Sequence, residues 1–251
     1  MATLVVGQEF DPAYVRMFKE QAGFVHDNED DAGPGTADPE RIEVAIIGCG
    51  MTGIGTALQA LDRGFRVRVF ERSDDIGGTW SINTYPGVGV DTPATYYSLS
   101  YELNPAWRQH YPTGREYYDY LCGVVEKHGL RRHIRFATEV LKTVWDDEAQ
   151  EWVITTLVDG RDVETVRAGA VISAMGPFQR PVYPDIPGAE TFRGDVMHAN
   201  RWDHDVEVTG KRVGVFGVSS TGVQVVSAIA AQVEHLTVFQ RQAAWVRPHP
   251  A

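Results

Sequence analysis

The chain has 251 residues, 43% of them hydrophobic, which suffices for a sizeable core in one large domain or two smaller ones. Its formal net charge of −11 argues against a nucleic-acid partner, because phosphate backbones recruit basic surfaces. No apolar run approaches the roughly 20 residues that span a bilayer, and the amino terminus lacks the basic and apolar regions of a signal peptide, so we expect a soluble cytoplasmic protein without a membrane partner.

The first 40 residues form an acidic segment, which we expect to be an extension followed by a linker. They hold nine acidic and only two basic side chains. Asp11-Pro12 begins a short amphipathic helix pattern, with the aspartate as cap and the proline at the first helical position. Residues 27–38 are acidic and contain Gly33-Pro34-Gly35, a composition typical of a linker.

Residues 42–71 have the pattern of a strand, a glycine-rich loop, a helix and a second strand. An apolar run at 42–47 enters the loop 48–53, and an apolar-periodic helix extends from it to about residue 63. A second strand at 66–70 ends on Glu71. This order predicts the opening of a Rossmann-like dinucleotide-binding unit.

The residues of this first loop have distinct expected roles. Gly48 permits the tight turn, Gly50 lets the backbone approach a pyrophosphate, and Gly53 lets the helix and strand pack closely. The helix amino terminus offers N–H donors and a favourable dipole to the phosphates. Glu71 is suited to accept a hydrogen bond from a ribose 2′-hydroxyl and would repel a 2′-phosphate, so FAD or NAD fits better than NADP. A glycine turn without a ligand is the alternative.

The middle of the chain predicts a capped helix and an antiparallel meander. Thr113 and Glu116 form a capping box for a helix that should reach residue 127 or 128 before Gly129 ends it. Three apolar-alternating runs between 134 and 172 are broken at 146–148 and 159–160, which indicates a β-meander. A buried strand at 171–174 and a proline-rich connector at 180–188 follow.

A second strand–loop–helix–strand pattern begins at residue 212. We expect a strand at 212–216, the loop Gly217-Val218-Ser219-Ser220-Thr221-Gly222, a helix to about residue 231 and a strand at 236–239. Gln240 stands where Glu71 stands in the first unit, and Arg241 follows it. A guanidinium without a nearby acid suits a 2′-phosphate, so NADP is preferred here over NAD. The alternative for Arg241 is a solvated charge at a strand end.

Two longer motifs surround these loops. Phe192, Gly194, His198 and the pair Trp202-Asp203 have the spacing of the Baeyer–Villiger monooxygenase fingerprint, and the chain resembles that family. The related N-oxidising flavin monooxygenases have an aromatic residue and lysine at the last pair. A second family pattern is also complete. It runs through Gly77-Gly78-Thr79-Trp80 and Tyr85-Pro86-Gly87 to Asp91.

The resemblance implies FAD at the first loop and NADPH at the second. We expect no metal site, since neither Cys49 nor Cys122 has the spacing of a zinc site. Trp80, Tyr85 and Asp91 fall in the segment that lies against the flavin in this family. Asp91 is expected to be a buried carboxylate that accepts a hydrogen bond from the family's catalytic arginine, since an unpaired buried charge is costly. The alternatives are core packing for the two aromatic residues and a cap of Thr92-Pro93 for Asp91. The cofactor-binding residues expected are Gly48, Gly50, Gly53, Glu71, Gly78, Thr79, Trp80, Tyr85 and Asp91 for FAD, and Gly217, Ser219, Thr221, Gly222 and Arg241 for NADPH.

His198 and Ser219 each leave two interpretations open. In this family the fingerprint lies on the connector between the nucleotide domains, so His198 and Trp202 are expected to position that connector. A buried, purely structural hydrogen-bonding role for His198 is the alternative. Ser219 stands where the family usually has glycine. Its side chain either obstructs the approach of the pyrophosphate or donates its hydroxyl to a phosphate.

The resemblance implies an FAD- and NADPH-dependent monooxygenase that inserts one oxygen atom of O2 next to a ketone carbonyl, giving an ester or lactone. The match corresponds to about half of a typical member, so activity is expected to need sequence beyond residue 251. The layout looks most like the 4-hydroxyacetophenone monooxygenase group. Alternatives are a truncated, non-catalytic dinucleotide-binding module or an N- or S-oxidising flavin monooxygenase. A disulfide reductase would need a close cysteine pair, which Cys49 and Cys122 do not provide.

The fold expected is therefore α/β, with two Rossmann-like dinucleotide-binding units, FAD first and NADP second, and an antiparallel meander. We expect both units to be incomplete. The boundaries are an extension and linker at 1–40, the first part of an FAD-binding domain at 41–178, and a connector with the start of an NADP-binding domain at 179–251.

Overall fold

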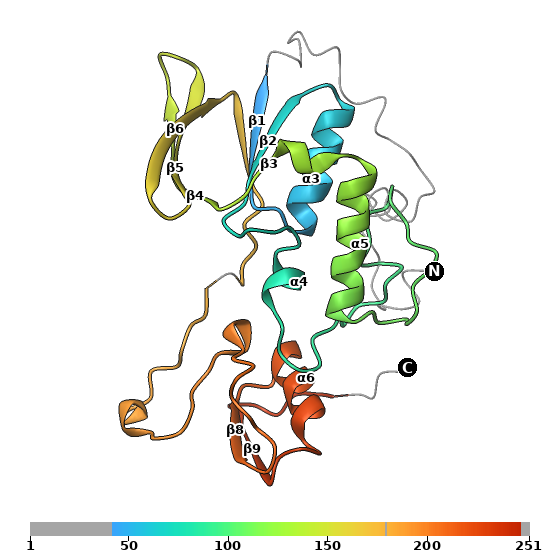
Figure 1. Cartoon of the computed structure of the whole chain (residues 1–251), viewed down its shortest axis with the longest axis vertical. Coiled ribbons are helices and arrows are strands. Elements are labelled where there is room, and N and C mark those ends of the chain that lie inside the picture. The colour runs from blue at the N-terminus through green and yellow to red at the C-terminus, as the bar shows by residue number, and fades with distance from the viewer. Residues whose placement is uncertain (1–41, 179, 247–251) are drawn as a thin grey trace, which may run out of the picture.

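The computed structural model describes residues 42–178 and 180–246. The expected amino-terminal helix and linker lie outside these residues. A parallel sheet in the order β3-β2-β1-β7 forms the centre of the first unit (Figure 1). Its strands are β1 (Glu43–Ile47), β2 (Arg66–Phe70), β3 (Ile134–Arg135) and β7 (Ala170–Ser173).

The two faces of this sheet are covered by different elements, as the alternation of side chains along a strand requires. Val44 and Ile46 of β1 belong to the core formed with α3 (Met51–Asp62), α5 (Gly114–Lys127) and the short helix η2 (Leu130–His133). Ala45, between them, faces the meander instead. The sheet is thus the middle layer, between the helices and the meander, and it fixes the position of the glycine loop that follows β1.

The predicted antiparallel meander is confirmed as β4 (Thr138–Asp146), β5 (Glu151–Val158) and β6 (Asp162–Ala168). Ile154 and Ala168 pack beneath the sheet residues Ala45 and Phe70. The strand predicted at 171–174 forms as β7, but it is half-buried rather than buried. The reason is its position at the sheet edge, where β1 is its only sheet neighbour among the described residues.

The predicted helix after Thr113 is confirmed in detail. The Thr113 hydroxyl oxygen accepts a hydrogen bond from the Glu116 backbone N–H at 3.2 Å, and Gly129 adopts the left-handed conformation after the last turn. The Glu116 carboxylate does not complete the capping box. It accepts instead from the backbone N–H of Arg108.

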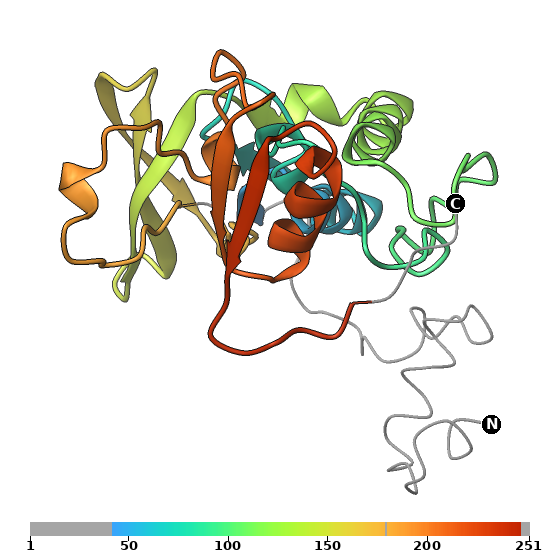
Figure 2. The same ribbon diagram turned by 90° about the horizontal axis from the view of Figure 1, so that it is seen from below.

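The second unit consists of β8 (Arg212–Phe216), α6 (Ser220–Ile229) and β9 (His235–Phe239), with the two strands parallel. The helix ends two residues before its predicted end. Figure 2 shows α6 on one side of this sheet. On the other side Phe216 and Phe239 stack at 4.5 Å between ring centroids and are largely exposed.

A long connector joins β7 to β8 and contains two short helices, η3 (Ala189–Thr191) and η4 (Ala199–Arg201). In the first unit, α4 (Thr79–Ile82) precedes an irregular segment whose turn at residues 85–88 reaches α6 (Figure 1). Among the described residues, no helix is long and apolar enough to cross a membrane.

Candidate functional site

The first glycine loop has the geometry of a tight strand-to-helix turn. Gly48 adopts φ +100°, and a Cβ atom there would lie 2.6 Å from the carbonyl oxygen of Ala174. A Cβ on Gly53 would lie 1.9 Å from the Gly48 carbonyl oxygen. Both positions therefore exclude any side chain, as the sequence predicts. Gly50 has ordinary torsion angles, and its added Cβ would make only ordinary contacts, with Gly78 at 3.7 Å and with the Gly77 carbonyl oxygen at 4.0 Å.

The second loop repeats this geometry. Gly217 adopts φ +98°, and a Cβ on Gly222 would lie 2.3 Å from the Gly217 carbonyl oxygen. In each unit the first glycine donates its N–H to the last residue of the second strand, Phe70 or Phe239, at 2.8 and 2.9 Å. The predicted internal duplication is therefore confirmed at the level of single hydrogen bonds.

The helices that begin at these loops lack the usual side-chain caps. Neither Gly50, before α3, nor Ser219, before α6, gives a side-chain cap, and neither helix has an acidic residue in its first turn. The structural helix α5 has both, in Thr113 and Glu116. Uncapped N–H groups combined with the positive end of the helix dipole form an anion-binding site. Both loops thus fit a pyrophosphate.

One open cleft of about 3640 Å³ lies between the two units and is lined by both loops. Its volume is several times the roughly 300–1,000 Å³ typical of a single-ligand pocket. All the predicted site residues line it except Gly53, which is buried against Gly48. The fold therefore brings the predicted FAD and NADP residues to a common space, although binding itself stays a prediction.

Glu71 follows β2 and is buried, with 7% of its surface exposed. One carboxylate oxygen accepts the backbone N–H of Cys49 at 2.7 Å, and the other accepts that of Ser73 at 2.8 Å. These bonds hold the carboxylate at the end of the first loop. Each oxygen retains acceptor capacity for a ribose hydroxyl on the cleft side.

The equivalent position after β9 carries Gln240, followed by Arg241. The register pairs Phe216 with Phe239 in the second unit and Ile47 with Phe70 in the first, so Gln240 and Glu71 are structural equivalents. Arg241 is exposed and lines the cleft. The second site thus offers a cation where the first offers an anion.

Ser219 causes no backbone strain at the position that corresponds to Gly50. Its torsion angles are φ −68° and ψ 177°, close to the −80° and −170° of Gly50. Its hydroxyl does not cap α6. The side chain is therefore available to a phosphate. This favours the interpretation in which Ser219 donates its hydroxyl to a phosphate over the one in which it obstructs the pyrophosphate.

The segment from Gly77 to Asp91 lies along the cleft, but its members have different surroundings. Gly77 and Gly78 both have positive φ, and Gly78 touches Gly50. The half-buried Trp80 packs on Tyr117 at 5.1 Å between ring centroids. Tyr85 belongs to the core of the second unit, beside Val225 and Ile229 of α6.

The predicted burial of Asp91 is wrong. The sequence predicts a buried carboxylate, but Asp91 is exposed at the cleft. Its carboxylate forms no hydrogen bond or ion pair within the described residues, so the proposed cap of Thr92-Pro93 is not formed either. Nothing in the described part of the chain covers this residue, which leaves its charge solvated.

His198 acts within the connector. Its Nδ1 accepts the backbone N–H of Asn200 at 3.1 Å, and its ring packs edge-on against Tyr183. Asn200 is buried and donates from its side chain to Asn83 of the first unit at 3.2 Å. Trp202 packs on the second unit. The fingerprint thus contacts both units, which agrees with a positioning role for His198.

Sequence reasoning missed the polar contacts between the units. Gln224 of α6 bonds to Tyr85 and Gly89, and His204 lies 2.9 Å from the Thr84 hydroxyl. The available signal was a glutamine among apolar residues in the first turns of α6. Alone, that signal does not separate an inter-unit contact from a solvated side chain.

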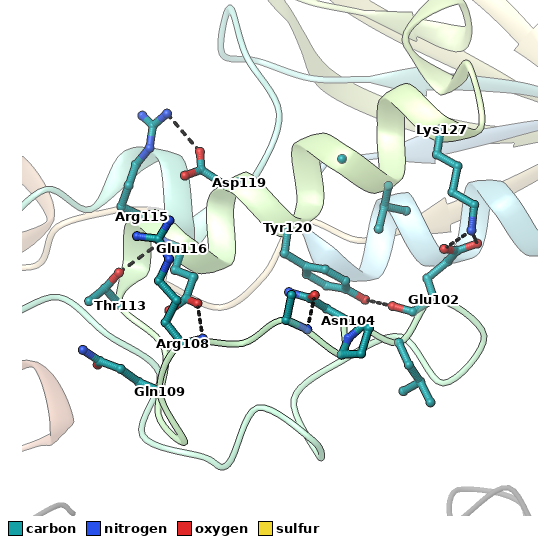
Figure 3. Close-up of a pocket in the computed structure, with 15 residues that line it drawn as sticks. Glu102, Asn104, Arg108, Gln109, Thr113, Arg115, Glu116, Asp119, Tyr120 and Lys127 are labelled. Atoms are coloured by element: carbon teal, nitrogen blue, oxygen red, sulfur yellow. Dashed lines mark hydrogen bonds and ion pairs between the residues drawn. The ribbon is translucent and has the colours of Figure 1, made fainter. Parts of the chain in front are cut away.

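A smaller hollow of about 680 Å³ lies apart from the cleft, between the segment 102–109 and α5 (Figure 3). Four of its charged side chains form ion pairs, Lys127 with Glu102 and Arg115 with Asp119. The Tyr120 hydroxyl donates to the Glu102 carbonyl oxygen. None of the glycine-loop residues reaches this hollow.

Both cysteines are free, and neither is suited to redox chemistry. Burial, followed by the nearby Glu71 charge, raises the pKa of the Cys49 thiol to about 12, and burial also raises the pKa of Cys122. Because the thiolate is the reactive form, Cys49 should be inert at neutral pH. This opposes a disulfide reductase.

We therefore expect Ellman's reagent at pH 8 to label at most Cys122 in the native chain, and both cysteines after unfolding in guanidinium. A Cys49→Ser variant should give the same native labelling as the wild type, whereas Cys122→Ser should abolish it. Rapid labelling of both thiols in the folded protein would contradict the burial of Cys49.

Comparison with known proteins agrees with this geometry. The sequence pattern of the family described as flavin-binding monooxygenase-like matches residues 41–249. A Baeyer–Villiger monooxygenase from Streptomyces coelicolor is 42% identical over 210 residues, which cover 83% of this chain and 40% of that protein.

Two solved structures share the fold. An oxidised steroid monooxygenase bound to NADP matches with a TM-score of 0.72 and 38% identity, over 82% of this chain and 40% of that one. OTEMO in complex with FAD and NADP matches with a TM-score of 0.73 and 32% identity, over 84% and 41%. The chain thus spans about two fifths of the length of these relatives, and its predicted α/β fold with a Rossmann-like parallel sheet is confirmed. It belongs to the flavin-binding monooxygenase-like family, among relatives that include Baeyer–Villiger monooxygenases.

Proposed function

We propose that this chain forms the FAD- and NADPH-binding part of a Baeyer–Villiger-type monooxygenase. The reaction inserts one oxygen atom of O2 next to a ketone carbonyl and gives an ester or lactone. The observation that carries the proposal is the shared cleft, into which two uncapped helix amino termini open from duplicated glycine loops. A cytoplasmic location and a small-molecule ketone substrate are part of the same proposal.

FAD fits the first loop. The N–H groups at the start of α3 hold the pyrophosphate, and Gly78 packs close to the loop, since a Cβ on Gly78 would lie 3.0 Å from the Gly50 Cα. Glu71, fixed by Cys49 and Ser73, accepts the ribose hydroxyl. When bound, FAD supplies the activation of O2 with electrons from NADPH.

NADPH fits the second loop. The start of α6 and the free hydroxyl of Ser219 bind its pyrophosphate, and Arg241 binds the 2′-phosphate.

Asp91 presents its carboxylate to the cleft, where an arginine from elsewhere in the enzyme would pair with it. His198 orients the turn that holds Asn200 against the first unit.

The test is the visible absorption spectrum of the purified chain after incubation with FAD and removal of free flavin, followed by anaerobic addition of NADPH. We expect a flavin spectrum that bleaches. In Gly222→Ala the flavin spectrum should persist without bleaching, because a Cβ there would lie 2.3 Å from the Gly217 carbonyl oxygen and distort only the second loop.

The possible results separate the alternatives. A colourless protein would sink the proposal that this chain holds FAD. A bound flavin that NADPH leaves oxidised would favour a non-catalytic dinucleotide-binding module instead.

A further inference from the structure

Gln224 of α6 joins the second unit to a segment of the first. Its Oε1 accepts a hydrogen bond from the Tyr85 hydroxyl at 2.8 Å, and its Nε2 donates to the Gly89 carbonyl oxygen at 2.8 Å. Burial raises the pKa of Tyr85, so this hydroxyl is a proton donor at neutral pH. The side-chain amide of Gln224 therefore uses its acceptor and one of its donors for hydrogen bonds to residues that lie 139 and 135 positions away in the sequence.

The backbone of the same segment lies directly on α6. Gly87 has φ +81°, and a Cβ there would lie 2.7 Å from the Gln224 carbonyl oxygen and 3.1 Å from the Ala228 side chain. Only glycine allows this approach. The Tyr85 ring packs on Val225 and Ile229, so apolar contact holds the two parts together while the amide fixes their alignment.

The other side of the segment is bonded to the first unit. The Val90 N–H donates to the Pro112 carbonyl oxygen, and the Gly114 N–H donates to the Val88 carbonyl oxygen, each at 2.9 Å. Gly114 is the first residue of α5. Residues 85–91 thus connect the starts of α5 and α6, and they carry Tyr85, Gly89 and Asp91 to the cleft.

The position of Gln224 links the two candidate cofactor sites. It lies four residues after Ser220, one turn from the uncapped end of α6. Gly89, its partner, lies two residues before Asp91. A displacement of the helix terminus by a bound dinucleotide would therefore move Gly89 and Tyr85 with it.

We propose that Gln224 is a positioning residue that couples dinucleotide binding at α6 to the flavin-side segment 85–91. The inference rests on the proposed function, in which NADP binds at α6 and FAD at α3. NADP at the second loop restricts the motion of the start of α6. The hydrogen bonds of Gln224 to Tyr85 and Gly89 then restrict the motion of segment 85–91. FAD then meets an ordered site and binds more tightly, and the effect is reciprocal.

The experiment measures the Kd of FAD for the whole chain, with and without saturating NADP+. The affinity of NADP+ is measured separately by calorimetry. In the wild type we expect NADP+ to tighten FAD binding at least about fivefold, the lower end of typical coupling between sites. In Gln224→Leu the ratio should fall to about one, while the Kd of FAD alone changes less than about twofold. A merely structural contribution would weaken FAD binding equally in both conditions.

Gln232→Leu is the matched control. Its side chain is exposed and bonds only within its own unit, to the Ala228 carbonyl oxygen, so the coupling should match the wild type. Gln224→Glu keeps an acceptor for Tyr85 but loses the donor to Gly89, and should show reduced coupling. If Gln224→Leu does not fold, Gln224→Glu replaces it as the test variant.

Each failure has its own signature. A wild-type ratio of one, or full coupling retained in the Gln224 variants, would overturn the inference and leave the proposed function intact. An absence of NADP+ binding to the wild type would overturn the proposed function, and the inference with it.

Discussion

Replacing Gly53 with alanine is expected to lower the melting temperature of the chain by about 6–12 °C and to remove FAD binding. The added Cβ would lie 1.9 Å from the carbonyl oxygen of Gly48, a backbone atom that cannot rotate away. Overpacking against backbone costs about 3 kcal/mol, and each kcal/mol shifts the melting temperature of a chain of this size by about 2–4 °C. The turn that presents the loop N–H groups would open.

Gly123→Ala provides the matched control within the same unit. Gly123 lies inside α5, and a Cβ there meets nothing within 4 Å. The variant should gain about 0.5–1 kcal/mol of stability, because alanine has the better helix propensity, and it should retain FAD. Circular dichroism melting and flavin absorbance after desalting measure both effects. An unchanged melting temperature in Gly53→Ala would contradict the close packing of Gly53 on the Gly48 carbonyl oxygen.

Much of the fold is readable from local sequence because its causes are local. The apolar run of β1, the Thr113 cap and Gly129 at the end of α5 each act within a few residues. The duplicated loops follow from the same logic, since Gly48 and Gly217 adopt positive φ and Gly53 and Gly222 touch the turn before them. Strand periodicity also predicted the meander.

The arrangement of the two units is not readable in this way. Gln224 bonds to residues 135 and 139 positions away, and in sequence it is indistinguishable from a solvated side chain on a helix. The exposure of Asp91 could not be predicted either, because burial depends on which distant residues cover a position. The packing of Tyr85 on α6 has the same kind of cause, while its place against the flavin stays a prediction. Polar contacts over long separations have no periodic signature.

Arg241 should decide which nicotinamide dinucleotide the second unit prefers. Arg241→Gln is expected to weaken NADP+ binding roughly 10–100-fold and to leave NAD+ binding nearly unchanged. A hydrogen bond to a charged group contributes about 1.5–3 kcal/mol, and each 1.4 kcal/mol is a factor of ten. The 2′-phosphate is the one group that distinguishes the two ligands, so a loss confined to NADP+ locates the contact.

The double variant Gln240→Glu with Arg241→Gln carries the argument further, because it recreates after β9 the carboxylate that Glu71 provides after β2. It should bind NAD+ in preference to NADP+, since a carboxylate accepts a ribose hydroxyl and repels a phosphate. Arg161→Gln removes the same charge at the exposed β5–β6 turn, away from the cleft, and should change neither affinity. Calorimetric Kd values for both dinucleotides, at low and high salt, complete the test. Equal losses for NADP+ and NAD+ in Arg241→Gln would place the guanidinium on the pyrophosphate instead, and no loss at all would leave it a solvated charge.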